Sequence, residues 1–454
     1  MIIDGGLILK TKEELLAKEN DCLSVYAARS NNPFLNKKLY NEEDDGDIRL
    51  SYQRDRDRII HSRAFRRLMH KTQVFNANKG DHYRNRLTHT LEVCQISRSI
   101  GKNLDLNEEL IEAIALGHDL GHTPFGHIGE RTLHNIIHGN LEQEIDINHT
   151  NFGGFKHNFQ SLQVIDNIES SSENYKGLNL SLAVRDGILK HTGNKIKSDV
   201  FNKSTHRFEL ESQEISYSSL NLENLIVDMP AITLEGQIVA ISDEIAQCTH
   251  DLEDGIRANI IKLNDIKQNK IVLEVSKKYD INLELLNEPY IIRNTLIKHM
   301  IGFLVNNVCE ESEKIIKENY SSNIPSFLDI NDVYNINCIS LTKEIYDNLR
   351  ELQKLITKLV ISSQEVSQSD SKAEIIMKKI FRAYYIHPQQ LPDYVLKRYF
   401  VKTGREFNRS KLEELKLNLI TDGDFVRLIC DHIASMTDQY AAREYKKLYE
   451  PEYY

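Results

Sequence analysis

The sequence predicts a mainly α-helical fold, and three observations support this prediction. The 454 residues include only 8 Pro and 20 Gly, the two residue types that most often interrupt helices. Apolar residues recur at i, i+3 and i+4 spacing, which places them on one face of a helix. Few segments alternate apolar and polar residues with the period of two that marks a half-buried strand, so we expect at most a short hairpin.

Segments with the helical spacing follow one another along the chain. They cover residues 13–28, 56–69, 91–104, 108–120, 159–168, 180–189, 237–252, 292–308, 341–361, 373–385 and 424–448. Between them, the polar stretch 191–224 is expected to form a loop or irregular arm, and the Ser/Gln-rich run 362–372 to connect two helices. Ser, Asn and Pro interrupt the pattern at about 320–340. We therefore expect a catalytic core in residues 1–320, which includes the polar insertion, and a C-terminal helical region in residues 321–454.

The composition excludes several classes of protein. The chain has 57 Lys and Arg against 67 Asp and Glu, a formal net charge of -10, which makes it a poor candidate for sequence-independent binding to duplex DNA. No window approaches the roughly 20 apolar residues of a membrane span, and the first residues lack the features of a secretory signal. The 6 Cys are scattered and form no CxxC motif. We expect reduced thiols in a cytoplasmic protein without a membrane span.

Two local concentrations of residues indicate where a site lies. Nine of the 17 His fall within residues 82–157, which points to a metal or acid/base site, although single members could be surface or capping residues. Within residues 54–86, ten basic residues accompany three Asp, a local charge of +7. Such a segment suits a small polyanion such as a nucleoside triphosphate, and the alternative is a solvated helix face.

The densest motif is GHDLGHTPFGHIGE, directly after the predicted helix 108–120. His118 and Asp119 are adjacent at the helix end, where an imidazole and a carboxylate can reach one cation. Gly121, Pro124 and Gly126 then break the helix and let the backbone approach a ligand. A His-Asp pair also occurs by chance in many chains, so the motif gains meaning only from its neighbours.

Two further residues complete a candidate metal site. In RNRLTHTLEV, Thr88 is the expected N-cap of the next helix, which puts His89 in the first turn. Asp243 lies on the amphipathic segment 237–252, and a buried carboxylate is costly without a cation. Taken alone, His89 could be a cap or a packed residue and Asp243 a solvated one; together with His118 and Asp119 they suggest a metal site.

These residues stand in segments that resemble the deoxyguanosinetriphosphate triphosphohydrolase family of the HD phosphohydrolase superfamily. The segments are RDRDRIIHSRAFRRLMHKTQVF, RNRLTHTLEV, GHDLGHTPFGHIGE, GGFKHNFQSL, ISDEIAQCTHDLEDG and DHIASMTDQYA, in order from about residue 50 to 445. The resemblance implies an HD-domain helical fold with a C-terminal helical extension. It also implies metal-dependent hydrolysis of a deoxynucleoside triphosphate, dGTP or another, to the deoxynucleoside and inorganic triphosphate.

The resemblance also implies roles for individual residues. The ligands of a divalent metal (Mn, Mg, Fe, Ni or Zn) would be His89, His118, Asp119 and Asp243. The acid/base pair near the leaving 5′ oxygen would be His127 and Glu130. The substrate contacts would be Gln73, Arg86, His122, His157 and Asp251. Members of the family assemble as tetramers or hexamers, so we expect a homo-oligomer.

One position departs from the family pattern. Gln247 stands where the family usually has a Tyr near the sugar, which leaves the preferred nucleotide open. Two other interpretations also stay open: an HD-type nucleotide monophosphatase or phosphodiesterase, and a nucleotide-binding regulatory protein with a silent site. A nucleotide activator at a separate site and single-stranded DNA as an effector are likewise undecided by the sequence.

Overall fold

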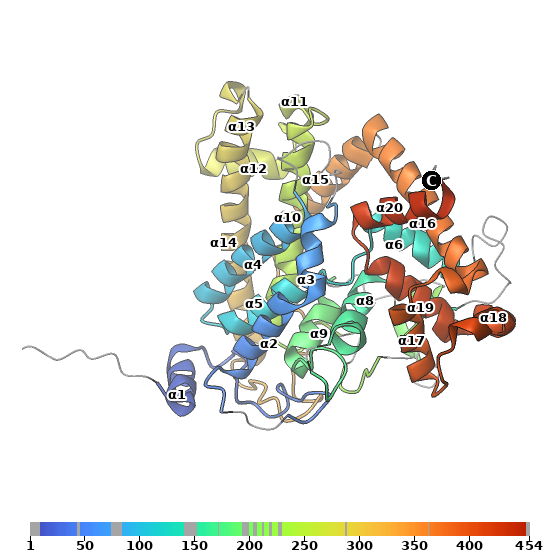
Figure 1. Cartoon of the computed structure of the whole chain (residues 1–454). Coiled ribbons are helices and arrows are strands. Elements are labelled where there is room, and N and C mark those ends of the chain that lie inside the picture. The colour runs from blue at the N-terminus through green and yellow to red at the C-terminus, as the bar shows by residue number, and fades with distance from the viewer. Residues whose placement is uncertain are drawn as a thin grey trace, which may run out of the picture.

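The computed structural model describes most of the chain. The residues outside this description are 1–9, 43–45, 74–83, 140–151, 171, 193–198, 203–206, 211–212, 218–219, 226–228, 287, 362 and 451–454. The described chain is mainly α-helical, as the sequence predicts (Figure 1). Among its helices, none combines the length and the apolar character needed to cross a membrane.

The helices fall into three successive groups. The first group is α1 (Lys12–Cys22), α2 (Ser51–His61), α3 (Arg63–Arg67), α4 (Arg86–Asn103), α5 (Glu108–Gly117), α6 (Gly126–Ile137), α8 (His157–Gln163), α9 (Leu182–Lys190) and α10 (Leu234–Arg257). The second is α11 (Leu263–Ile266), α12 (Lys270–Lys278), α13 (Pro289–Ile292) and α14 (Lys298–Tyr320). The third is α15 (Lys343–Ile361), α16 (Gln364–Ile386), α17 (Asp393–Lys402), α18 (Leu412–Ile420), α19 (Gly423–Ala434) and α20 (Asp438–Tyr449).

The helix α10 lies at the centre of the first group, where it packs against α4, α5 and α9 (Figure 1). Thr233 caps its start by accepting the backbone N–H of Gly236. Apolar residues recur along it at helical spacing and are fully buried, including Ile238, Ile245 and Leu252. This packing holds the α4, α5 and α10 backbones rigidly beside one another, which a precise site requires.

The described side chains form two hydrophobic cores. The larger core joins α2, α4, α5, α9 and α10 to α12, α14 and α15. The second core joins α16–α20 to Leu133, Ile136 and Ile137 of α6. The helix α6 thus belongs to the C-terminal core, although it follows directly on the site motif. The helix α14 ends at Tyr320 and α15 begins at Lys343, so no α-helix crosses the boundary expected near residue 320. The division into two domains stays a prediction.

The polar stretch 191–224 holds more regular structure than the expected loop or arm. It contains β1 (Asp199–Asn202), β2 (Arg207–Leu210) and β3 (Gln213–Ser216). The strands pair antiparallel in the order β1-β2-β3. The sheet therefore has one strand more than the short hairpin that we expected.

Three local predictions were wrong. The cap of α4 is Asn85, whose side chain accepts the N–H of Thr88, so Thr88 is the third helical residue and the partner in a capping box. The run 362–372 does not connect two helices: Ser363 caps α16, and nearly all of the run lies in that helix. The segment 424–448 forms two helices, α19 and α20, because the chain turns after Ala434 and Thr437 caps a new start.

Candidate active site

The four residues that the sequence suggests as metal ligands come together in the structure. His89 belongs to α4, His118 and Asp119 follow the end of α5, and Asp243 lies in α10. Nε2 of His89 is 3.0 Å from Oδ1 of Asp243, and Nε2 of His118 is 3.4 Å from Oδ1 of Asp119. Ligand atoms of His89, His118 and Asp119 all lie within 4.8 Å of one another. Two imidazoles and two carboxylates therefore converge on one point.

The donor set fits a divalent cation. Nδ1 of His118 donates to the carbonyl of Ala115 at 2.6 Å, which leaves Nε2 with a lone pair that has no hydrogen-bond partner among the described residues. Burial would raise the pKa of Asp119, but His122, His118 and Arg86 lower it well below its ordinary value. Both nitrogen and ionised carboxylate donors are thus available, and this mixture suits a divalent metal ion.

Asp119 is held from two further sides. Nη1 of Arg86 donates to its Oδ2 at 2.7 Å, and Nδ1 of His122 is 2.9 Å from its Oδ1. Arg86 and Asp119 are both buried. A Cβ at Gly126, where φ is +60°, would lie 3.2 Å from Nη2 of Arg86, so only a glycine fits there without strain. The guanidinium keeps Nε without a partner among the described residues, so it has donors left for an anion.

A row of imidazoles extends from the candidate metal ligands. The rings of His122 and His157 are 3.9 Å apart, and Nε2 of His157 is 3.2 Å from Nε2 of His191. Nδ1 of His157 is 2.9 Å from Oε2 of Glu130, whereas Nδ1 of His127 is 3.8 Å from the same oxygen. Glu130 therefore serves two histidines, and His157 is the nearer one.

Burial and charge set the protonation of this row. Burial would raise the pKa of Glu130, but His157 and His127 lower it well below its usual range, so Glu130 is a carboxylate. Burial, reinforced by the charge of His118, lowers the pKa of His191 to about 3. The side chain of His127 is 65% exposed.

The remaining predicted substrate residues lie near these histidines. The carbonyl of Gln73 is 3.4 Å from the position of a Cβ on Gly126, and its Oε1 is buried without a partner among the described residues. Asp251 lies on α10 beyond Asp243; burial and the charge of Asp254 raise the pKa of Asp251 to about 7. Gln247 stands between Asp243 and Asp251 on the same helix and is half-buried.

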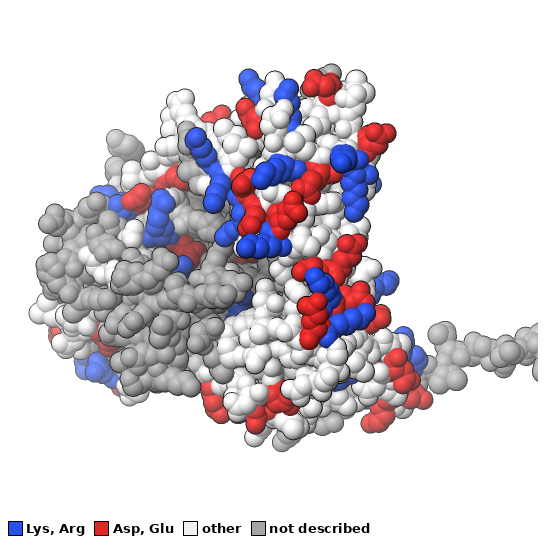
Figure 2. Space-filling view, turned by 180° about the vertical axis from the view of Figure 1, so that it is seen from behind, with Lys and Arg blue, Asp and Glu red and all other residues white. Residues whose placement is uncertain are grey.

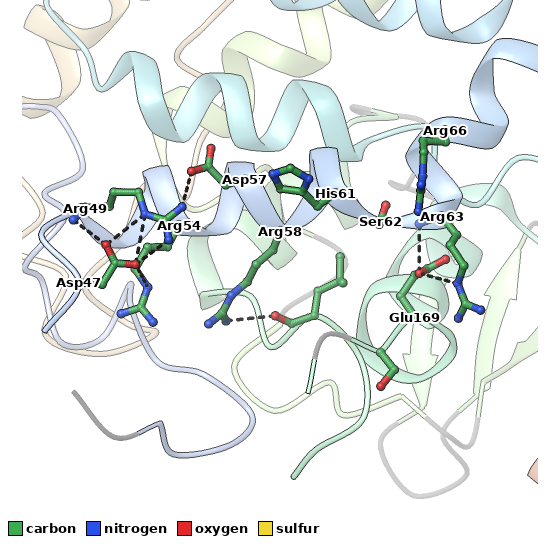
Figure 3. Close-up of a pocket in the computed structure, with 12 residues that line it drawn as sticks. Asp47, Arg49, Arg54, Asp57, Arg58, His61, Ser62, Arg63, Arg66 and Glu169 are labelled. Carbon is green, nitrogen blue, oxygen red and sulfur yellow. Dashed lines mark hydrogen bonds and ion pairs between the residues drawn. The ribbon is translucent and has the colours of Figure 1, made fainter. Parts of the chain in front are cut away.

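The described residues of the basic segment 54–86 do not form one continuous surface. Arg86 reaches the active site, whereas other arginines line a separate pocket of about 590 Å³ (Figure 3). In that pocket Arg49 is 2.7 Å from both Asp47 and Asp57, and Arg63 is 3.5 Å from Glu169. Carboxylates of the same wall thus neutralise much of its charge. Lys79 lies outside the described residues.

The surface as a whole mixes charges in the same way. Figure 2 shows Lys and Arg side chains beside Asp and Glu over the described part of the face that Figure 1 hides. Neither sign covers that described part continuously. This agrees with the conclusion from the composition that non-specific duplex binding is unfavourable.

The C-terminal region contributes contacts that the sequence analysis missed. The buried Nζ of Lys71 donates to the carbonyls of His122 and Ala434. Burial, with the charges of Arg67 and Arg86, lowers the pKa of Lys71 to about 7. Because the residues of these contacts are distant in sequence, no local pattern reveals them.

Two further histidines were also missed. His191 lies at the end of α9, where its Nδ1 is 2.7 Å from the carbonyl of Ile188 and its ring faces His118. His250 lies on α10 beside His89. Burial lowers the pKa of His250 to about 4, so its ring is neutral near pH 7. Both lie beyond the cluster of nine histidines. His250 stands in the segment ISDEIAQCTHDLEDG, seven residues after Asp243 on one helix, and this spacing could have found it.

Comparisons with known proteins agree with this arrangement. A model of the HD domain matches residues 86–247, and a model of the phosphohydrolase-associated domain matches residues 339–447. Proteins named deoxyguanosinetriphosphate triphosphohydrolase-like are similar over nearly their whole length. The protein from Caldanaerobacter subterraneus subsp. tengcongensis is 34% identical over 98% of this chain and 97% of its own. The Geobacter sulfurreducens protein is 33% identical over 97% and 98%, and the Bartonella quintana protein 34% over 96% and 98%.

Proposed function

The chain belongs to the family of deoxyguanosinetriphosphate triphosphohydrolase-like proteins, and from this premise we propose that it hydrolyses deoxynucleoside triphosphates, dGTP or another. The products would be the deoxynucleoside and inorganic triphosphate. The observation that carries the proposal is the convergence of His89, His118, Asp119 and Asp243 beside Arg86 and a row of histidines. A phosphate ester site needs both a cation and donors for the phosphate oxygens.

The four converging residues would hold a divalent metal ion. Such an ion supplies positive charge for the phosphate oxygens and makes water more acidic. Asp119 also orders the site, because it fixes Arg86 on one side and His122 on the other. The free donors of Arg86 would then bind a phosphate oxygen of the substrate, and the guanidinium geometry suits this.

The proton for the leaving group would come from His127. Its exposed ring can approach the 5′ oxygen of the departing deoxynucleoside, and the Glu130 carboxylate beside it stabilises the charged imidazole. His157, which is closer to Glu130, would keep that carboxylate in place and face the phosphates. Gln73 and Asp251 would contact the nucleoside, and Gln247 would replace the ring of a Tyr with a group that can hydrogen-bond a hydroxyl.

A substrate and product profile tests the proposal. Purified protein is incubated with each deoxynucleoside triphosphate and Mn²⁺ or Mg²⁺, with and without a second nucleotide as activator, and the products are resolved. Release of intact triphosphate supports the proposal. Activity only on monophosphates or cyclic nucleotides would instead identify another HD reaction. We also propose self-association into a homo-oligomer, which light scattering on the full chain would measure.

A further inference from the structure

A chain of side chains leads from the metal ligand His89 to the edge of the molecule. Nδ1 of His89 is 3.3 Å from Nδ1 of His250, and the two rings stand edge to face with centroids 5.4 Å apart. Nε2 of His250 is 2.8 Å from Oε2 of Glu92. Glu92 in turn accepts a hydrogen bond of 2.8 Å from Nε of Arg84. The His89 and His250 rings are both buried, so these are the contacts that decide their hydrogen-bonding state.

Glu92, at the outer end of this series of contacts, is fixed by its neighbours. Burial would raise the pKa of Glu92, but His250 and Arg84 lower it to about 2, so Glu92 is a carboxylate. Arg84 also binds Glu253 and Asp254 at the end of α10. The start of α4 is thereby tied to the end of α10, and the Glu92 oxygen faces His250 in a fixed position.

The contacts between Glu92, His250 and His89 indicate where the protons of the two imidazoles lie. A carboxylate can only accept a hydrogen bond, so Nε2 of His250 must carry the hydrogen that faces Glu92. Nδ1 of His89 faces Nδ1 of His250, so one of these nitrogens donates and the other accepts. A His89 that binds a metal through Nε2 carries its hydrogen on Nδ1, so it is the donor and His250 is the acceptor.

The other nitrogen of His89 lies beside a second candidate ligand. Nε2 of His89 and Oδ1 of Asp243 are 3.0 Å apart. Two ligand atoms about 2.1 Å from one ion and at right angles to each other are about 3 Å apart, so the separation is that of two ligands of one metal. A cation held by both would take the place of the hydrogen bond that joins them.

We propose that His250 and Glu92 are positioning residues that fix the hydrogen of His89 on Nδ1 and so prepare Nε2 to bind the metal. The inference rests on the proposed metal site. Partners of this kind orient the imidazole and raise its basicity, and their loss weakens metal binding by about 10- to 100-fold. In this chain a second imidazole stands between the ligand and its carboxylate.

Metal affinity, measured apart from turnover, tests the inference. The full chain is freed of metal with a chelator, and the Kd of Mn²⁺ is measured by calorimetry for Glu92→Ala and His250→Phe. Both substitutions should raise the Kd about 10- to 100-fold. His250→Asn, whose amide oxygen can take the place of Nδ1, should change it by less than about threefold. Circular dichroism and thermal unfolding of the metal-free variants check that the fold is intact.

Glu108→Ala is the matched control. Glu108 is the first residue of α5; its side chain is 36% exposed against 38% for Glu92, and it pairs with Arg98 of α4 instead of a histidine. The control should bind Mn²⁺ as the wild type does. If His250→Phe does not fold, Glu92→Ala decides, because its side chain is partly exposed. If Glu92→Ala binds Mn²⁺ with wild-type affinity, the positioning role of His250 and Glu92 is wrong, but the metal site stands. If the wild-type protein binds no Mn²⁺, the proposed metal site is wrong as well.

Discussion

The carboxylate of Asp438, at the start of α20, accepts the backbone N–H of Phe125 at 2.9 Å. Its other oxygen accepts the N–H of Thr72 at 2.8 Å. Phe125 has a φ of +61° and directly precedes α6, which carries His127 and Glu130. The C-terminal region therefore holds two loops of the active site in place, and the conformation of one of them is strained for a residue with a side chain.

Removal of this carboxylate should misplace α6. In Asp438→Ala two backbone N–H groups lose their acceptor, and we expect the free energy of unfolding to fall by about 1–3 kcal/mol. Because the acid/base pair would move, kcat should fall on the order of ten- to a hundredfold while metal content stays at the wild-type level. Steady-state kinetics and metal analysis measure this. Asp424→Ala, which removes an exposed ion pair with Lys402, should leave kcat and metal content unchanged. Equal kcat in the two variants would refute the role of Asp438 in placing α6.

The acid/base assignment makes a separate expectation. The exposed His127 is not needed for packing, so His127→Ala should fold normally, keep its metal and lose kcat by about 10²- to 10⁴-fold. Asp119→Ala should lose metal and activity together, because the cation loses a ligand and Arg86 its partner. Turnover and metal content are measured on both variants. Loss of metal in His127→Ala would show that this histidine is a ligand instead.

The conformation at Gly126 gives a test of close packing. Gly126→Ala would place a Cβ 3.2 Å from Nη2 of Arg86 and 3.4 Å from the carbonyl of Gln73, at a φ of +60°. Gly404 has a φ of +66° with no atom within 4 Å of such a Cβ, so Gly404→Ala carries the backbone strain alone, about 1–2 kcal/mol. We expect both to lose stability and only Gly126→Ala to lose kcat/KM. Equal kinetics in the two variants would mean that the contact with Arg86 has no role.

The buried Glu235 should make stability depend on pH. Burial is the main influence and raises its pKa from 4.5 to about 7, against the backbone N–H groups of Asn107 and Ala28 that bind it. Between these values the folded chain holds a proton that the unfolded chain has released. The contribution of Glu235 to the free energy of unfolding therefore falls by about 3 kcal/mol as pH rises from about 4.5 to 7, and it is constant above pH 7.

Glu235→Gln stays neutral throughout this range and should not show that loss. Urea unfolding at pH 5 and pH 8 measures it: the free energy of unfolding of the variant should change less between the two pH values than that of the wild type. The same change in both proteins would show that Glu235 is ionised in the folded state at pH 5.

The sequence predicted those parts of the site that lie in local patterns. His118 and Asp119 follow an apolar helix in one motif, and the helical fold follows from apolar spacing. Glu130 lies closer to His157 than to His127 because of how α8 packs against α6. The spacing of residues within either segment does not predict this packing. The contact between His250 and His89 escaped notice for the same reason, since the two residues are remote in sequence.

Errors in the helix boundaries have a similar cause. Asn85 and Thr88 are both good caps, and the choice of Asn85 depends on a capping box in which each binds the other's backbone. The Ser/Gln-rich start of α16 lacks a strong apolar pattern, yet it is helical because Ser363 caps it and Val366 and Ala373 are buried. Tertiary packing here outweighs local composition.

In the proposed reaction, water attacks the α-phosphorus and releases the whole triphosphate. Hydrolysis of dGTP, or of the nucleotide that proves the better substrate, in ¹⁸O-labelled water tests this most directly, with both products analysed by mass spectrometry. We expect one ¹⁸O atom in inorganic triphosphate and none in the deoxynucleoside. Pyrophosphate or orthophosphate as the sole phosphate product, or ¹⁸O in the deoxynucleoside, would contradict the account.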